Sequence, residues 1–318
     1  MSARAIELAT KNEPRRTRSR TSALLPPGPS TLRRLVADAR VELVPMKSLE
    51  RAARELRPGS HVSMTCSPAR SIEATLDESE HLITAGHSVT PHISARMVRT
   101  PEHLAAIRAR LVALGIREIF VVGGDAGEPG CYFDAIEFIE ALLEVDDARG
   151  PEHRQIGHIG HPAYPDTHPF ITTEQLHEAL HRKQELILAT GRTSHVSTQM
   201  CFSADQIRNW LRMERASGFT VPVHLGVPGV IDTAKLMTMG VRLGVGTSLR
   251  YLTKNRRALG SLISQRSFEP DRLLAPLADD LDELGIDGIH LYTLNQVDAT
   301  ERWRQRTLAR NQTVSDTE

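Results

Sequence analysis

The feature that most constrains the fold is a regular alternation of short β-rich runs with segments that carry helix signals. Each run but the last is followed by such a segment. Strands that alternate with helices are typical of βαβ units and a parallel sheet. Eight such runs in 318 residues predict a (β/α)8 TIM barrel of the α/β class, formed as a single domain. The runs cover residues 39–44, 61–65, 88–94, 118–122, 155–160, 195–200, 221–226 and 288–293.

Two of the intervening segments have clear boundaries. In 100–115, Thr100 is the expected N-cap, Pro101 occupies the first turn and Gly115 ends the helix. In 203–218, Ser203 and Gly218 have the same two roles as cap and stop. Both segments are therefore predicted to be helices that cover the sheet.

A doubly wound Rossmann-type fold is the alternative, but it requires a G-x-G-x-x-G turn after the first strand, and "VELVPMKSLE" has none. We see no internal repeat and no linker within the barrel segment. Residues 1–34, rich in Arg, Ser and Pro, are predicted to be a disordered arm. The barrel is expected over 35–304 and a C-terminal tail over 305–318.

Composition excludes several classes of partner. The 39 basic and 39 acidic side chains balance, so no electrostatic bias toward nucleic acid or a membrane surface is expected. No apolar run approaches the roughly 20 residues that a spanning helix needs. The three cysteines form no C-x-x-C pair and are typical of reduced thiols. We expect a soluble cytoplasmic protein, for which a homo-oligomer is compatible with the sequence.

In a TIM barrel the chemistry lies where strands end and βα loops begin. The polar residues at these points form a ring that packing of the core would not require. They are Glu42, Thr65, His92, Asp125, Tyr164, His168 and Gln199.

The glycine-rich stretch "VVGGDAGEPG", residues 121–130, is not a phosphate loop. A Walker-type loop needs Lys and Ser/Thr after its last glycine, whereas Gly130 is followed by Cys131 and Tyr132. The stretch is a tight loop that lets backbone approach a flat ligand, with Asp125 at its root. Asp125 is either a catalytic carboxylate or the cap of the next helix.

Metal and nucleophile motifs are weak. His158 and His161 have H-x-x-H spacing, but residues three apart in a strand point to opposite faces and cannot share one ion. No G-x-S-x-G nucleophile elbow is present, and Cys66 and Cys201 have no catalytic signature. No bound metal is therefore predicted.

The strand-end segments resemble those of the 5,10-methylenetetrahydrofolate reductase family, in its short bacterial form. "VELVP" resembles E-F-F-P-P, "VSMT" resembles V-S-V-T, and "TPHIS" resembles A-P-H-L-T. "GIREIFVVGGD" is similar to G-I-R-x-I-x-A-L-R-G-D, and "AYPDTHP" to A-Y-P-E-V-H-P. The Arg-Lys pair at 182–183, "STQM" and "IHLYTLNQ" also have counterparts. These eight matches follow one another in order over residues 38–300.

The resemblance implies a reaction in which hydride from NADH or NADPH, usually through FAD, reduces the methylene bridge of 5,10-methylenetetrahydrofolate to 5-methyltetrahydrofolate, or the reverse. It implies that Glu42 is the general acid and that Asp125 stabilises a cationic iminium. Gln199, with Thr198 beside it, would bind the pterin, and Asn295 would lie near the folate. The residues it places around FAD are Thr65, His92, Gly124, Asp125, Tyr164, His168, Arg182 and Lys183.

The chain also departs from this family. Gly123 replaces a flavin-contacting arginine, Leu43-Val44 replace two aromatic residues, and Gln296 replaces a terminal arginine. The residues that match the family around FAD, namely Tyr164, His168, Arg182 and Lys183, favour a bound flavin. The departures keep open a flavin-independent reduction directly by NADH. Two alternatives of other classes are a pterin-dependent methyltransferase barrel and a non-catalytic folate-binding protein.

Overall fold

The computed structural model describes residues 30–124, 127–148, 150–242 and 267–310. Its centre is a closed barrel of eight parallel strands, so the predicted (β/α)8 barrel is confirmed. Each strand pairs with the strand before and after it in the barrel, and β10 closes the circle between β7 and β1. The strands are β1 (Arg40–Leu43), β2 (His61–Met64), β3 (Ser88–Ser94), β4 (Glu118–Val122), β5 (His158–Ala163), β6 (Thr193–Thr198), β7 (Val223–Pro228) and β10 (Ile286–Tyr292).

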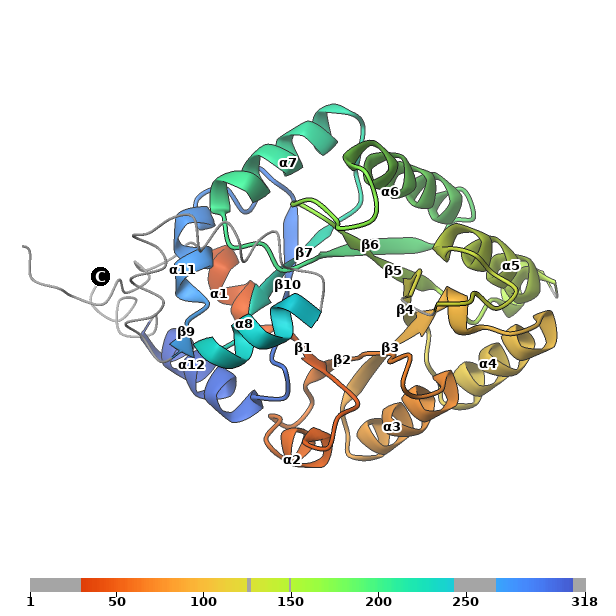
Figure 1. The fold of residues 1–318 in the computed structure, drawn as a ribbon, viewed down its shortest axis with the longest axis horizontal. Coiled ribbons are helices and arrows are strands. Elements are labelled where there is room, and N and C mark those ends of the chain that lie inside the picture. The colour runs from red at the N-terminus through yellow and green to blue at the C-terminus, as the bar shows by residue number, and fades with distance from the viewer. Residues whose placement is uncertain (1–29, 125–126, 149, 243–266, 311–318) are drawn as a thin grey trace, which may run out of the picture.

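Helices surround the barrel, as Figure 1 shows in a view along its axis. The two predicted helix boundaries are confirmed: the Thr100 side chain accepts from the His103 backbone N–H at the start of α4, and Ser203 caps α7 in the same way. The helices are α1 (Ser30–Ala37), α2 (Leu49–Arg54), α3 (Ile72–Thr84), α4 (Pro101–Ala113), α5 (Ala135–Asp147), α6 (Thr173–Leu188), α7 (Ala204–Ala216), α8 (Thr233–Arg242), α11 (Asp271–Leu274) and α12 (Val297–Arg310). Among the described residues, none of the helices is both long and apolar enough to cross a membrane.

The first and last helices differ from the prediction. The expected boundaries at 34/35 and 304/305 fall inside α1 and α12, and a helix does follow the last strand. Helix α12 was not predicted because its inner face mixes polar and apolar residues. Trp303 is buried there beside the buried ion pair of Glu301 and Arg304. A face of this kind lacks the apolar stripe that identifies a helix in a sequence. Residues 1–29 of the expected arm lie outside the described residues.

Strands β5 and β6 are displaced by two or three residues from their predicted positions. The carboxylate of Asp146 accepts hydrogen bonds from the backbone N–H groups of Gln155 and Ile156, and its contact with Arg192 is 2.9 Å long. These residues are thereby held outside the sheet, so β5 begins at His158 and ends at Ala163. Tyr164 therefore follows the end of the strand directly.

The inside of the barrel is polar, whereas its apolar core lies between the strands and the helices. Arg40 and Glu118 form an ion pair inside the barrel. The rings of His195 and His224 stack with centroids 4.0 Å apart. Gly160 makes room for these rings, since a Cβ there would lie 2.5 Å from His195.

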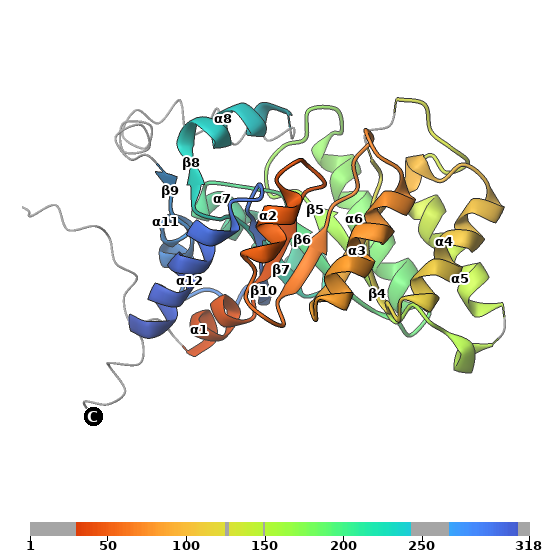
Figure 2. The same cartoon turned by 90° about the horizontal axis from the view of Figure 1, so that it is seen from below.

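Helix α8 lies at one end of the barrel and α1 at the opposite end (Figure 2). In the sequence, α8 directly follows β8 (Ile231–Asp232), which pairs with β9 (Ser267–Phe268) in a two-stranded antiparallel sheet. Leu236 of α8 belongs to a small buried cluster with Met200, at the end of β6, and Leu294, at the end of β10. This cluster fixes α8 over the carboxyl ends of the strands.

Candidate functional site

A cavity of about 410 Å³ lies at the carboxyl ends of the barrel strands. This is the end of a TIM barrel at which binding and catalytic residues gather. The volume falls within the roughly 300–1,000 Å³ of small-molecule sites. The predicted site residues that line it are Glu42, Thr65, His92, Gly124, Tyr164 and Gln199.

Glu42 points into the barrel from β1 and is 8% exposed. Its Oε2 atom lies 3.1 Å from Nε2 of His290, a residue of β10. Burial raises the pKa of Glu42 to about 7, and His92 opposes that rise only in part. A carboxyl with such a pKa exists in both protonation states near neutral pH, which is what a general acid requires.

The two histidines next to Glu42 are neutral. Burial lowers the pKa of His92 to about 3, and burial likewise lowers the pKa of His290 to about 3. His92 lies 2.6 Å from the Ser63 hydroxyl through Nε2, and its ring stacks on Phe120. The floor of the cavity therefore contains one titrating acid among neutral hydrogen-bonding rings.

Thr65, Tyr164 and Gln199 lie around the rim. The Thr65 hydroxyl oxygen is buried without a hydrogen-bond partner among the described residues, so it can serve a ligand in the cavity. The Gln199 side-chain oxygen accepts from the Met200 backbone N–H at 2.8 Å, which fixes the amide. Tyr164 packs edge-on against His168, with centroids 5.1 Å apart.

Gly124 forms the cavity wall after β4. Its φ is +92°, and a Cβ there would lie 1.9 Å from the Ser94 hydroxyl, so glycine allows the loop to approach β3 closely. Asp125, to which the resemblance assigns the stabilising charge, lies outside the described residues. Its role stays a prediction.

Thr198 and Asn295, two predicted substrate residues, support the site from behind and do not line the cavity. The Thr198 hydroxyl accepts from the Gly226 backbone N–H at 2.8 Å. The Asn295 amide bonds both the N–H and the C=O of Val44, each at 2.9 Å, and also donates to Ser48. Asn295 therefore positions the loop that follows Glu42.

The basic pair of α6 also lies away from the cavity. Arg182 pairs with Glu140 of α5 at 3.3 Å on the outer surface. Lys183 is 7% exposed, on the buried face of α6. Burial lowers its pKa to about 8, and Asp134 opposes that change. The pair follows the start of α6 by nine and ten residues, or roughly 14 Å of helix. His168, in the preceding loop, contacts Tyr164 but is not itself among the residues lining the cavity.

Several lining residues were not identified from the sequence, among them His290, Tyr292 and Phe120. The signal was available in the strands, since alternate residues face the same side. His290 and Tyr292 share the inward face of β10 in this way. The Tyr292 hydroxyl donates to the Thr198 carbonyl at 2.9 Å, which ties β10 to β6.

No protein-family model matches the chain. A Clostridium thermocellum protein described as binding two copies of 5-methyl-5,6,7,8-tetrahydrofolic acid is similar in structure, with a TM-score of 0.49 and 9% identity over 88% of this chain and 99% of that one. A putative phosphonomutase from Burkholderia cenocepacia has a TM-score of 0.45 and 14% identity, covering 88% of this chain and 95% of its own. For an oxaloacetate acetylhydrolase the TM-score is 0.47 and the identity 11%, over 90% and 87%.

Proposed function

We propose that this protein is an oxidoreductase that reduces the methylene group of 5,10-methylenetetrahydrofolate with hydride from a nicotinamide. The observation that carries the proposal is Glu42: a buried carboxyl with a pKa of about 7, lining the cavity at the barrel mouth. It occupies the position that the sequence resemblance assigns to the general acid. A site that only bound folate would not need an acid of this kind there.

In this reaction the methylene carbon bridges two nitrogens of the folate. Protonated Glu42 gives its proton to one of these nitrogens, the bond from that nitrogen to the methylene carbon breaks, and an iminium cation forms on the other. Hydride then adds to the iminium carbon and completes the methyl group. The carboxylate left on Glu42 faces the developing cation, and solvent returns its proton.

The neighbours of Glu42 suit this role. His290, neutral at working pH, keeps a ring nitrogen 3.1 Å from the carboxyl and orients it in either protonation state. His92 is neutral as well, so neither ring holds Glu42 as a fixed carboxylate. The Gln199 amide at the rim offers donor and acceptor groups to the edge of a pterin.

The positions of Arg182 and Lys183 do not support a tightly held FAD. FAD has a pyrophosphate, which proteins usually hold with cations or a helix N-terminus. Here Arg182 is paired with Glu140 on the surface, and Lys183 is buried on the inner face of α6. Neither lines the cavity that contains Glu42.

We therefore favour the flavin-independent form of the reaction, in which NADH or NADPH gives hydride directly to the folate. A nicotinamide co-substrate dissociates after each turnover, so it does not require the tight binding that a resident flavin requires. No step in the proposed chemistry of Glu42 depends on the flavin.

The test is the oxidation of NADH and of NADPH by purified protein with 5,10-methylenetetrahydrofolate, with and without added FAD. We expect turnover by colourless protein and no gain from FAD. Glu42→Gln should still bind folate but lose roughly 10²- to 10⁴-fold in rate, the usual contribution of a general acid. The matched control is Glu144→Gln, an exposed glutamate of α5. Wild-type protein that turns over under neither condition would contradict the proposal.

A further inference from the structure

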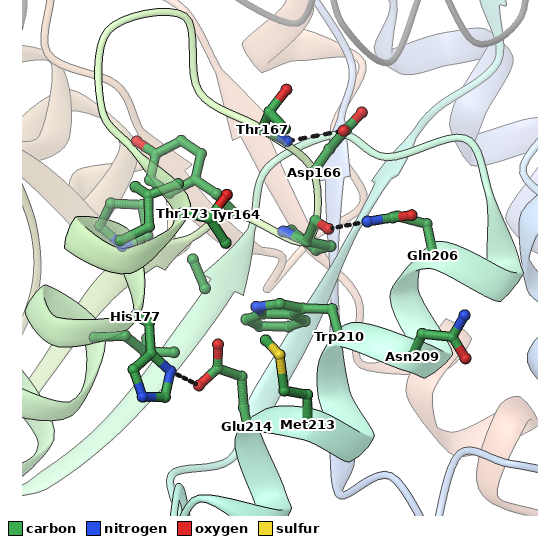
Figure 3. Close-up of a pocket in the computed structure, with 15 residues that line it drawn as sticks. Tyr164, Asp166, Thr167, Thr173, His177, Gln206, Asn209, Trp210, Met213 and Glu214 are labelled. Carbon is green, nitrogen blue, oxygen red and sulfur yellow. Dashed lines mark hydrogen bonds and ion pairs between the residues drawn. The ribbon is translucent and has the colours of Figure 1, made fainter.

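A second cavity, of about 260 Å³, lies between the loop after β5 and the helices α6 and α7. Figure 3 shows it in close-up, with His177 of α6 and Glu214 of α7 turned toward each other on one side. It shares Tyr164 with the wall of the barrel cavity but is lined mainly by helix residues. The mechanism above uses none of those helix residues.

Three potential metal ligands meet between α6 and α7, and two of them, His177 and Glu214, line this cavity. His177 and His181 are four residues apart on α6, so they lie on one face of the helix. Oε2 of Glu214 lies 2.8 Å from Nδ1 of His177 and 3.0 Å from Nε2 of His181. All three ligand atoms lie within 4.8 Å of one another.

Charge also favours a cation at this point. The Glu214 side chain is 2% exposed, and within the described part of the chain its ion-pair partners are the two histidines. Buried carboxylates are usually paired with a cation or coordinate a metal. A divalent ion bound by these three side chains would supply positive charge next to the buried carboxylate of Glu214.

The donor set indicates the metal. Two imidazoles and one carboxylate form a common three-ligand zinc set, with bonds of about 2.0–2.2 Å. In a tetrahedron of that size neighbouring ligand atoms lie about 3.4 Å apart. The two contacts to Glu214, at 2.8 and 3.0 Å, are shorter than that spacing by about 0.4–0.6 Å. His177 and Glu214 line the cavity, so the fourth position of the ion would face it.

The sequence contains the corresponding motif. Residues 177–181 read H-E-A-L-H, an H-E-x-x-H pattern on a helix. In metalloproteases that use this motif, its glutamate is the general base. Here Glu178 is exposed and does not line the cavity, so the motif supports metal binding without peptidase chemistry.

A second cluster inside the barrel, formed by Glu118, His158 and His195, is a weaker candidate. The guanidinium of Arg40 already forms an ion pair with Glu118 there. A divalent ion at that point would face an adjacent fixed positive charge. In the described part of the chain, no lysine or arginine forms an ion pair with Glu214 of the cluster between α6 and α7.

We propose that His177, His181 and Glu214 bind one Zn²⁺ ion, which joins α6 to α7 and leaves its fourth position to the cavity. This site is independent of the proposed reductase activity. It would hold the ion whether or not the barrel reduces folate.

The test uses the full-length protein without a histidine tag, stripped with a chelator and titrated with Zn²⁺ against a chromophoric zinc indicator. We expect one equivalent to bind and the melting temperature to rise with zinc. In His177→Ala, which alters a half-exposed residue, zinc affinity should fall by at least the roughly 10- to 100-fold that loss of an outer-sphere partner costs. Co²⁺ binding, followed by its visible absorption, should fall in parallel.

The matched control is His103→Ala, which removes a surface histidine bonded to Glu73 at 2.7 Å and should leave one equivalent bound. Glu214→Gln keeps the size of the buried side chain, and it provides the same test if His177→Ala fails to fold. Wild-type protein that binds no zinc would overturn the proposal. Equal zinc affinity in a folded ligand variant and in His103→Ala would overturn it as well.

Discussion

Replacing Glu42 by glutamine should stabilise the protein at neutral pH while it removes activity. The pKa of Glu42 rises from 4.5 to about 7 in the folded chain because burial disfavours the charged form. Each pH unit of that difference is worth roughly 1.4 kcal/mol, so ionised Glu42 costs the fold about 3 kcal/mol. Glutamine has the shape of the protonated acid and never ionises.

The pH dependence has a definite sign. A folded-state pKa above the unfolded value contributes stability below pH 4.5, and that contribution is lost as the pH rises through about 7. Glu42→Gln and wild type should therefore melt together near pH 4.5. At pH 8 the variant should melt higher, by on the order of 5 °C.

The measurement is thermal unfolding, followed by circular dichroism at several pH values from 4.5 to 8, with exposed Glu144→Gln as control. The control removes a carboxyl group without removing a buried one. A gap between Glu42→Gln and wild type that stays constant across this range would refute the raised pKa. A gap that appears equally in Glu144→Gln would refute its assignment to burial.

Three further changes test the supports of the site. Asn295→Ala removes three hydrogen bonds around Val44 and Ser48 from a residue with φ of +60°, and should lower the free energy of unfolding by about 2–4 kcal/mol in urea titrations; a loss below 1 kcal/mol would contradict this role. Gly124→Ala should destabilise more than Gly59→Ala, because both have positive φ but only Gly124 would clash with Ser94, and equal melting temperatures would show that the loop does not need this approach. Arg192→Ala removes one of the two arginines that pair with buried Asp146, leaving Arg108, and should cost about 2–4 kcal/mol, whereas Arg212→Ala, at an exposed pair with Glu283, should cost about 1 kcal/mol or less; similar losses would show that the buried pair of Arg192 contributes no more than an exposed one.

The barrel could be predicted because its signals are local. Thr100 and Ser203 cap their helices through hydrogen bonds that span three residues, and a sequence displays such spacing directly. Helix α12 could not be predicted in this way. Its buried Glu301–Arg304 pair resembles a solvated surface until the fold encloses it.

The site was predictable at the strand ends, where a polar residue after an apolar run marks the barrel mouth. This reasoning located Glu42, Thr65 and Gln199, all of which line the cavity. It could not separate residues that line the cavity from residues whose side chains bond to other parts of the chain. The Asn295 amide bonds Val44 and Ser48, and Arg182 pairs with Glu140. Both contacts join residues that are distant in the sequence.

The proposed zinc ligands could be identified only in part from the sequence. The H-E-x-x-H pattern at 177–181 is visible in the sequence, but only the packing of α6 on α7 brings Glu214 to it. Two histidines on a helix face are usually no more than surface residues. The third ligand comes from a segment more than thirty positions away.

The most direct test of the central claim follows the hydride itself. Flavin-free protein is given 5,10-methylenetetrahydrofolate and nicotinamide carrying deuterium at the transferred position, and the methyl group of the product is analysed by mass spectrometry. The account predicts one deuterium in each product methyl group from wild type, and almost no product from Glu42→Gln. Product without deuterium, or product formed only when FAD is added, would contradict direct transfer from the nicotinamide.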